Sequence, residues 1–388
     1  MQAPGGKILK RLSLMNQIDA IKFLCNCLNM RDNQMIIKRA MKKESFSWSI
    51  IISIANHHRL IPSLYHCLNQ KGLFESLPDV IQQQLFVNYK INEERNKRIV
   101  KQCIEIIENF NSIGIIPLLI KGTSHIMSGL YKDNAMRMMI DIDMLVPVDQ
   151  FHDAIMMLKQ IGYSVLKTSS DNICHHYPAM IRPNEVASVE LHHHMVLSAY
   201  QHLMPIDEVW YHSVPMKIGS HRYRIPSARH CITLNIIHNV LCDLHFSFAD
   251  IHLYQLYDFI LIHHFYKNEN WQIISDLFNK HKFANAFNYY MTFAEKLFFE
   301  PALPRIANSR LLSKLGWHCF YYQHKFKHLQ FSLKFVFFHL ICFMNFIKHP
   351  VSRKAMIKKF LQLNNYQSHI DFIYKEKGTR VLNNKKRR

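Results

Sequence analysis

Residues 138–146 read MMIDIDMLV, and this stretch decides which fold the chain can adopt. Its apolar residues predict a buried strand over 140–146. Successive side chains of a strand point to opposite faces, so Asp141 and Asp143 share one face while the apolar residues that alternate with them occupy the other. Two carboxylates are therefore expected side by side at the start of an otherwise apolar strand.

The segments on either side of this strand alternate between strand and helix patterns. The run IIPLLI at 115–120, bounded by Gly114 and Gly122, predicts another buried strand. The expected elements are, in chain order, a strand at 115–120, a helix at 124–131, a strand at 140–146, a helix at 150–161 that stops at Gly162, and a strand at 186–196. This alternation predicts an α+β protein, with a small mixed-sheet core flanked by N-terminal and C-terminal helical regions.

The rest of the chain has apolar residues at helical spacing, which sets the expected domain organisation. The spacing is helical from about 16 to 110 and again after Pro226. The expected domains are an N-terminal helical region at 1–110, the core at 111–225, a helical region packing on the core at 226–310, and an aromatic and basic C-terminal helical region at 311–388.

Composition limits the class of protein and its partners. A hydrophobic content of 49% excludes a disordered or fibrous chain. The net charge of +20 favours polyanionic partners such as nucleotides, RNA, anionic lipid or acidic glycan. Nine cysteines without a C-x-x-C pair give no complete disulfide framework, and the N-terminus lacks an export signal, so a cytoplasmic protein is expected. The C-x-C at Cys25 and Cys27 is interpreted as two packed helix residues.

The aspartate pair predicts a metal site. Two close carboxylates repel each other unless cations lie between them, and Mg²⁺ is a hard ion that prefers carboxylate oxygens; Mn²⁺ is the alternative. Two such ions about 3.5–4 Å apart can activate an attacking hydroxyl and stabilise a leaving phosphate oxygen. A D-x-D pattern alone is common at solvated strand ends, so its surroundings decide the interpretation.

A possible phosphate-binding turn precedes the aspartates. Lys121-Gly122-Thr123-Ser124 ends the strand at 115–120 and opens a helix, which places backbone N–H groups and two hydroxyls where phosphates could bind. Lys121 and Arg137 are further candidate phosphate contacts. The guanidinium of Arg137 is equally suited to a neighbouring carboxylate.

A third carboxylate is expected from the strand at 186–196. In the sequence VELHHH at 189–194, strand alternation places Glu190, His192 and His194 on one face. If this strand neighbours the aspartate strand, Glu190 becomes a third ligand and His192 can orient it or the acceptor. Two alternatives remain open: a polar strand face without ligands, or a zinc site that combines the histidines with Cys174, His175 and His176.

Taken in order, these residues resemble the uncharacterised nucleotidyltransferase group within the DNA polymerase β-like nucleotidyltransferase superfamily. The resemblance runs through Leu119-Ile120-Lys121-Gly122, Leu130-Tyr131, Arg137, the segment 141–146, Gly162-Tyr163 and the segment 189–192, and more faintly His238 and Asp258. It implies phosphate binding at Gly122 and Thr123, and metal binding by Asp141, Asp143 and Glu190. The usual Gly-Gly or Gly-Ser is Gly122-Thr123 here, and the spacing to Asp141 is long.

The resemblance predicts a Mg²⁺-dependent enzyme that moves a nucleoside monophosphate from a nucleoside triphosphate to an acceptor by a two-metal mechanism. The acceptor can be a small molecule, glycan, protein or RNA. The expected catalytic residues are Asp141, Asp143 and Glu190, and the expected nucleotide contacts are Lys121, Gly122, Thr123, Ser124, Arg137 and His192. The alternative function is a non-catalytic protein that binds a polyanion such as RNA, or a membrane surface, on the same fold.

The apolar segment 331–347 is the feature that relates most directly to membranes. It reads FSLKFVFFHLICFMNFI and is shorter than the roughly 20 residues needed to cross a bilayer. We interpret it as a buried helix or as one that lies on a membrane. In the second case residues 331–360 would contact anionic headgroups at the inner membrane face.

Overall fold

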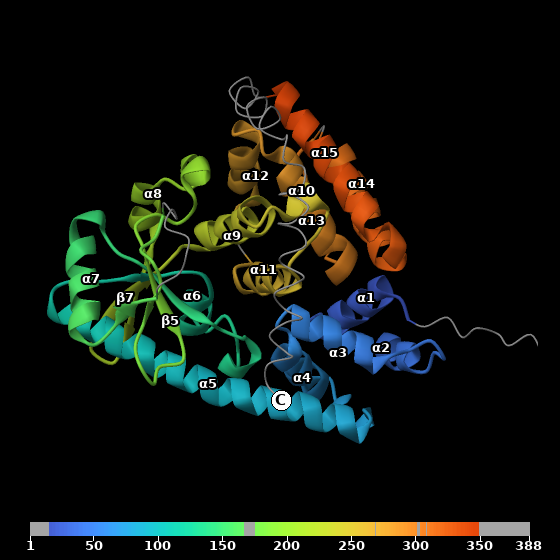
Figure 1. Cartoon of the computed structure of the whole chain (residues 1–388), viewed down its shortest axis with the longest axis horizontal. Helices are drawn as coiled ribbons and strands as arrows, with labels where there is room; N and C mark the ends of the chain where they lie inside the picture. Colours follow the sequence, from blue (N-terminus) through green and yellow to red (C-terminus); the bar gives the residue numbers. More distant parts are fainter. Residues whose placement is uncertain (1–14, 167–174, 268, 301–302, 308, 349–388) are drawn as a thin grey trace, which may run out of the picture. The chain divides into compact units, whose positions relative to one another are not determined.

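The computed structural model describes residues 15–166, 175–267, 269–300, 303–307 and 309–348. The chain up to Lys334 forms one compact unit, and a second unit begins at Phe335, within helix α15 (Gln330–Lys348). The fold described below is that of the first unit (Figure 1).

The N-terminal region is helical, as its apolar spacing predicts. Its helices are α1 (Gln17–Leu28), α2 (Gln34–Met41), α3 (Trp48–His57), α4 (Ile61–Gln70), the 3-10 turn η1 (Phe74–Ser76) and the long α5 (Asp79–Ser112). Local signals fix several ends: the Asn16 side chain accepts a hydrogen bond from the Asp19 N–H at 2.9 Å, and α4 carries Pro62 in its first turn. Cys25 and Cys27 are fully buried in α1.

The core contains a mixed sheet of seven strands among the described residues. They are β1 (Leu118–Leu119), β2 (Asp141–Leu145), β3 (Ser164–Val165), β4 (Met180–Ile181), β5 (Ser188–His192), β6 (Val214–Ile218) and β7 (His221–Ile225), in the spatial order β3-β4-β5-β2-β1-β7-β6. The pairs β2–β5 and β1–β7 are parallel and the others antiparallel. The predicted α+β class with a mixed sheet is confirmed.

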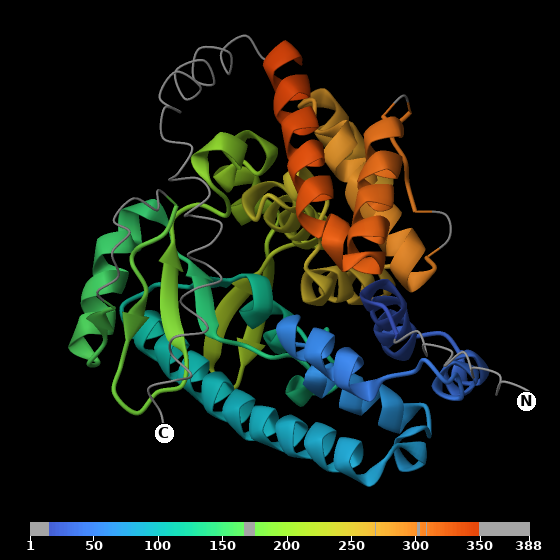
Figure 2. The same ribbon diagram turned by 45° about the vertical axis from the view of Figure 1, so that its right-hand side comes forward.

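The sheet separates two layers. On one face, buried residues of α5 and of α7 (Phe151–Gln160), such as Phe110 and Leu158, pack on Ile142 and Val189. Both ribbon views show α5 lying along the sheet (Figure 1, Figure 2). On the other face, Leu145 joins a larger core built by the N-terminal helices and by helices that follow the sheet.

The helices after the sheet are consistent with the apolar spacing seen beyond Pro226. They are α9 (Ala228–Ile237), the π-helical turn η5 (His238–Cys242), α10 (His245–Phe248), α11 (Leu253–Phe265), α12 (Trp271–Lys280), α13 (Ala284–Phe298), α14 (Leu311–Lys325) and the 3-10 turn η6 (Lys327–Leu329). The shorter helical segments between the strands are α6 (Lys121–Met127), η2 (Asn134–Met136), η3 (Val148–Gln150), η4 (Ser198–Leu203) and α8 (Ile206–His212). Among the described residues, none of the helices is both long and apolar enough to span a bilayer.

Some element boundaries differ from the sequence-based expectation. Helix α6 begins at Lys121, three residues before the expected start, and the strand expected at 115–120 pairs only over Leu118–Leu119. The strand expected at 186–196 ends at His192, so strand alternation does not extend to His194. The described cysteines are free thiols, and Cys174 lies outside the described residues.

Candidate active site

The parallel pairing of β2 with β5 brings two of the predicted carboxylates together. Asp143 and Glu190 are direct partners in the register, and Asp141, two residues earlier in β2, lies on the same face. Asp143 is buried, whereas Asp141 and Glu190 are partly exposed. Burial and the neighbouring charge of Asp143 raise the pKa of Asp141 to about 6, which is the effect expected of crowded, partly buried carboxylates.

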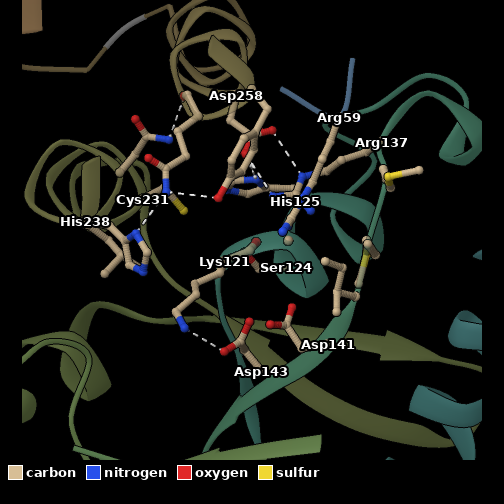
Figure 3. Close-up of a pocket in the computed structure, with 18 of the residues that line it drawn as sticks. Arg59, Lys121, Ser124, His125, Arg137, Asp141, Asp143, Cys231, His238 and Asp258 are labelled. Carbon is tan, nitrogen blue, oxygen red and sulfur yellow. Dashed lines mark hydrogen bonds and ion pairs between the residues drawn. The ribbon is translucent and has the colours of Figure 1, made fainter. Parts of the chain in front are cut away.

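The ammonium group of Lys121 lies close to the carboxylates of Asp143 and Glu190. Its Nζ is 2.7 Å from Asp143 Oδ1 (Figure 3). The same atom is 4.0 Å from Glu190 Oε2. Burial alone would lower the pKa of Lys121, but the charges of Asp143 and Glu190 outweigh it and raise the pKa above its ordinary value. Lys121 was predicted as a phosphate contact, which stays a prediction; in the structure its ammonium group lies against carboxylates.

His192 completes a cluster of three potential metal ligands. Its Nε2 lies 2.8 Å from Asp143 Oδ1 and 3.6 Å from Glu190 Oε2, and ligand atoms of these three residues all lie within 4.8 Å of one another. Burial alone would raise the pKa of Asp143, but Lys121 and the hydrogen bond with His192 hold it well below its usual range. Asp143 is therefore a carboxylate at neutral pH.

Side chains of the protein itself contact the predicted phosphate-binding turn, Lys121-Gly122-Thr123-Ser124. A Cβ atom on Gly122 would lie 2.1 Å from Arg137 Nη1, so glycine is required there by the close approach of the guanidinium group. The Thr123 hydroxyl accepts a hydrogen bond from the Asp143 N–H at 3.1 Å, and the Ser124 hydroxyl donates to the Lys121 carbonyl at 2.8 Å. The two hydroxyls that were predicted to bind phosphate thus hold β2 and the first turn of α6 in place.

Arg137 forms a two-point ion pair with Asp258 of α11. Its Nε donates to Oδ1 at 3.1 Å and its Nη2 donates to Oδ2 at 2.9 Å. Tyr131 also donates to this carboxylate, and His125 Nδ1 lies 3.6 Å from it. Asp258 is 2% exposed, so the pair is desolvated. Of the two roles considered for Arg137, the structure shows contact with a carboxylate, and this contact ties the core to the helices after the sheet.

A pocket opens beside Asp141 and Asp143. It contains about 800 Å³ of empty space, part of it open to solvent. One side is formed by the core through Lys121, Asp141 and Asp143 (Figure 3). The other side is formed by Arg59, which follows α3, and by Asn235, His238, Tyr254 and Gln255 from the segments after the sheet. The carboxylates of Asp141 and Asp143 therefore line a cavity that is partly open to solvent.

Arg59 is a pocket residue that the sequence analysis missed. It follows α3 with a φ of +56°, is exposed, and its Cζ lies 5.8 Å from the centre of the Tyr254 ring. Lys121 and Arg137 are both neutralised by carboxylates. Within the described part of the chain Arg59 makes no ion pair, which leaves its charge available to an anion. Nothing in the local sequence distinguishes it from the other basic residues.

The remaining histidines expected near β5 do not form a zinc site among the described residues. His193 Nδ1 contacts the His175 carbonyl at 3.0 Å, and the His176 ring lies 4.9 Å from that of His192. No three side chains of His175, His176, His193 and His194 converge as ligands in the described structure.

The amino-acid sequence matches the model of one known protein family. The model of a family described as uncharacterised nucleotidyltransferase matches residues 44–299, which is more than half of the chain. The chain therefore belongs to the uncharacterised nucleotidyltransferase family. This membership supports nucleotidyl transfer as the general activity, with a nucleotide as substrate. No curated protein matches the chain.

Proposed function

We propose that this protein is a Mg²⁺-dependent nucleotidyltransferase of the DNA polymerase β-like type, which transfers a nucleoside monophosphate from a nucleoside triphosphate to an acceptor. The observation that carries the proposal is the convergence of Asp143 and Glu190, with Asp141 on the same face, beside a pocket that Asp141 and Asp143 line. In this proposal the core expected at 111–225 supplies the catalytic residues, and the helical regions supply the rest of the pocket.

The residues fit a hard divalent cation. Asp143 and Glu190 present carboxylate oxygens, which Mg²⁺ and Mn²⁺ prefer, and His192 lies against both carboxylates. The raised pKa of Asp141 and the ammonium of Lys121 beside Asp143 support this fit, because both reflect negative charge concentrated in this cluster. A bound divalent ion supplies positive charge to the triphosphate and lowers the pKa of an attacking hydroxyl.

The chain's own residues supply positioning and charge. Asp143 and Glu190 would bind the divalent ion. His192 fixes the rotamer of Asp143, because its Nε2 lies 2.8 Å from Asp143 Oδ1. Arg59 faces the same pocket and is suited to the negative charge of a triphosphate. His238, Gln255 and Tyr254 are placed to contact the base or the acceptor. Such an arrangement catalyses phosphoryl chemistry mainly by orientation and charge neutralisation.

Pyrophosphate release tests the proposal. The full chain is incubated with Mg²⁺, each nucleoside triphosphate and a panel of hydroxyl and phosphate acceptors, and pyrophosphate is measured. We expect Asp143→Asn and Glu190→Gln to lower the rate at least about 100-fold, because each removes a charge that the transition state requires. Asp149→Asn, which removes an exposed aspartate near β2, is the matched control and should leave the rate unchanged.

The same variants distinguish the alternative function. A non-catalytic polyanion binder would release no pyrophosphate with any acceptor. It would bind RNA with an affinity that falls steeply with salt and that is the same in Asp143→Asn as in the natural chain. That combination of results would replace the enzymatic proposal.

A further inference from the structure

Asp243, His245 and His252 form a second cluster of potential ligands, outside the carboxylate site. Asp243 directly follows η5, His245 begins α10, and His252 immediately precedes α11. Ligand atoms of the three side chains all lie within 4.8 Å of one another, and the centres of the two imidazole rings are 4.1 Å apart. We propose that Asp243, His245 and His252 bind a divalent transition metal ion, with Zn²⁺ as the best match.

The donor set supports this choice of metal. Two imidazole nitrogens and one carboxylate oxygen are ligands that Zn²⁺ prefers, and three protein ligands leave a fourth position for water. Mg²⁺ would favour an all-oxygen set, such as the carboxylates of the first site. The two clusters are therefore expected to select different ions.

A buried nitrogen atom without a hydrogen-bond partner also supports a metal site here. His245 Nε2 is buried and has no hydrogen-bond partner among the described residues. A buried polar atom without a partner is costly, and coordination of a metal ion would satisfy it.

The backbone around the cluster is strained. Leu244 has a φ of +58° and Ala249 a φ of +49°, so two residues with side chains adopt the left-handed conformation on either side of α10. This conformation turns the short segment so that Asp243 and His245 face His252. A metal ion that links all three residues would stabilise the turn.

The cluster is also connected to the pocket. Gln255 Nε2 donates to Asp243 Oδ2 at 3.1 Å and lies 2.9 Å from His238 Nδ1, which is itself 3.2 Å from Asp243 Oδ2. Gln255 and His238 both line the pocket. Groups that contact a metal ligand in this way are oriented by it, so the ion would fix the helical wall of the pocket rather than take part in the reaction.

Metal titration tests the proposal without any assay of enzyme activity. The full chain, free of affinity tag, is stripped with EDTA and titrated with Zn²⁺ against a chromogenic chelator, with metal content measured by mass spectrometry. The titration is done in the Asp143→Asn, Glu190→Gln background so that the first cluster does not contribute. We expect one tightly bound equivalent, whose affinity falls about 100-fold or more in His245→Ala and in His252→Ala. His152→Ala, an exposed histidine beside an aspartate on α7, is the matched control.

Two further measurements keep the test decisive. Asp243→Asn removes the charge with little change in shape, and it must also weaken binding if either alanine variant fails to fold. Co²⁺ in place of Zn²⁺ should give the visible absorption bands of a four-coordinate site, and these bands should be lost in His252→Ala. Unchanged stoichiometry and affinity in the folded variants would overturn the second site. Because metal content alone is read, that result would leave the proposed transferase activity standing.

Discussion

Lys121 Nζ lies 2.7 Å from Asp143 Oδ1, so the carboxylate expected to bind metal already has a cation of the chain's own beside it. The ammonium group neutralises part of the negative charge that Asp141, Asp143 and Glu190 concentrate on one face of the sheet. A divalent ion that enters the site must therefore compete with Lys121 or displace it.

Replacing Lys121 should make the fold more dependent on a divalent cation. In Lys121→Ala the carboxylates lose their counter-ion, so the variant should melt at a lower temperature than the natural chain in EDTA. Addition of Mg²⁺ should raise the melting temperature more in the variant than in the natural chain, because binding stabilises the folded state and no ammonium competes. Thermal denaturation followed by circular dichroism measures both. Lys132→Ala, at an exposed lysine, should behave as the natural chain does; an equal Mg²⁺ effect in all three proteins would contradict the prediction.

Asp141→Asn should stabilise the protein at alkaline pH while lowering activity. The folded-state pKa of Asp141 is raised from 3.8 to about 6, so the folded chain holds more protons than the unfolded chain between about pH 4 and 6. Stability therefore falls as the pH rises through this window, and the ionised carboxylate costs about 1–3 kcal/mol above it. Urea denaturation in EDTA should show Asp141→Asn more stable by about this amount at pH 8 and equal at pH 4. Asp149→Asn should show no such difference, and a less stable Asp141→Asn at pH 8 would refute the assigned shift.

The buried ion pair of Arg137 with Asp258 should be costly to break from one side. Asp258→Ala leaves the guanidinium group desolvated and unpaired, so we expect a loss of about 3–5 kcal/mol in the free energy of unfolding. Chemical denaturation is the measurement. Glu94→Ala, which removes an exposed pair with Lys97, should cost only about 0–1 kcal/mol. The double variant Arg137→Met, Asp258→Leu should recover much of the loss; a double variant less stable than Asp258→Ala would show that the charges themselves are needed.

Arg59→Ala should weaken nucleotide binding without affecting the fold. Hydrogen bonds to charged groups contribute about 1.5–3 kcal/mol, so loss of the side chain should raise the dissociation constant of a Mg²⁺-bound nucleoside triphosphate about 10- to 100-fold. Titration with a fluorescent triphosphate measures this. Because Arg59 is exposed, the unfolding free energy should change by less than about 0.5 kcal/mol. Arg39→Ala removes an exposed arginine of α2 and should bind as the natural chain does; equal affinity in both variants would exclude Arg59 from the phosphate site.

The strand and helix patterns near the site were predictable because they depend on local periodicity. Alternation along 141–146 places the aspartates on one face of the sheet and Ile142 in the core on the other. The stop of α7 was also readable: Gly162 adopts a φ of +95°, a conformation that glycine accepts readily. The pairing of β2 with β5 could be stated only as a condition, because strand order depends on contacts between distant segments.

The features that were missed depend on such distant contacts. Strand β6 carries exposed and half-buried residues and lacks the apolar alternation that reveals a strand, whereas in β7 Tyr223 and Ile225 are buried but alternate with basic residues over only five positions. Arg137 meets its partner 121 positions later in the chain, and no local pattern announces the pair. Arg59 reaches the pocket from a turn in the N-terminal region. Short motifs therefore indicated the type of chemistry, whereas no local motif indicated Arg59, the residue proposed to bind the triphosphate.

One residue that does not line the pocket links the two strands that carry the proposed ligands. Arg95 of α5 donates through Nε to the Met139 carbonyl at 3.1 Å and through Nη2 to the Val186 carbonyl at 3.0 Å, just before β2 and β5 begin. A single guanidinium group is thus hydrogen-bonded to the backbone just before both strands and fixes the distance between their first residues. Random mutagenesis that selects for lost activity should therefore recover changes at position 95, although that side chain touches neither the nucleotide nor the metal.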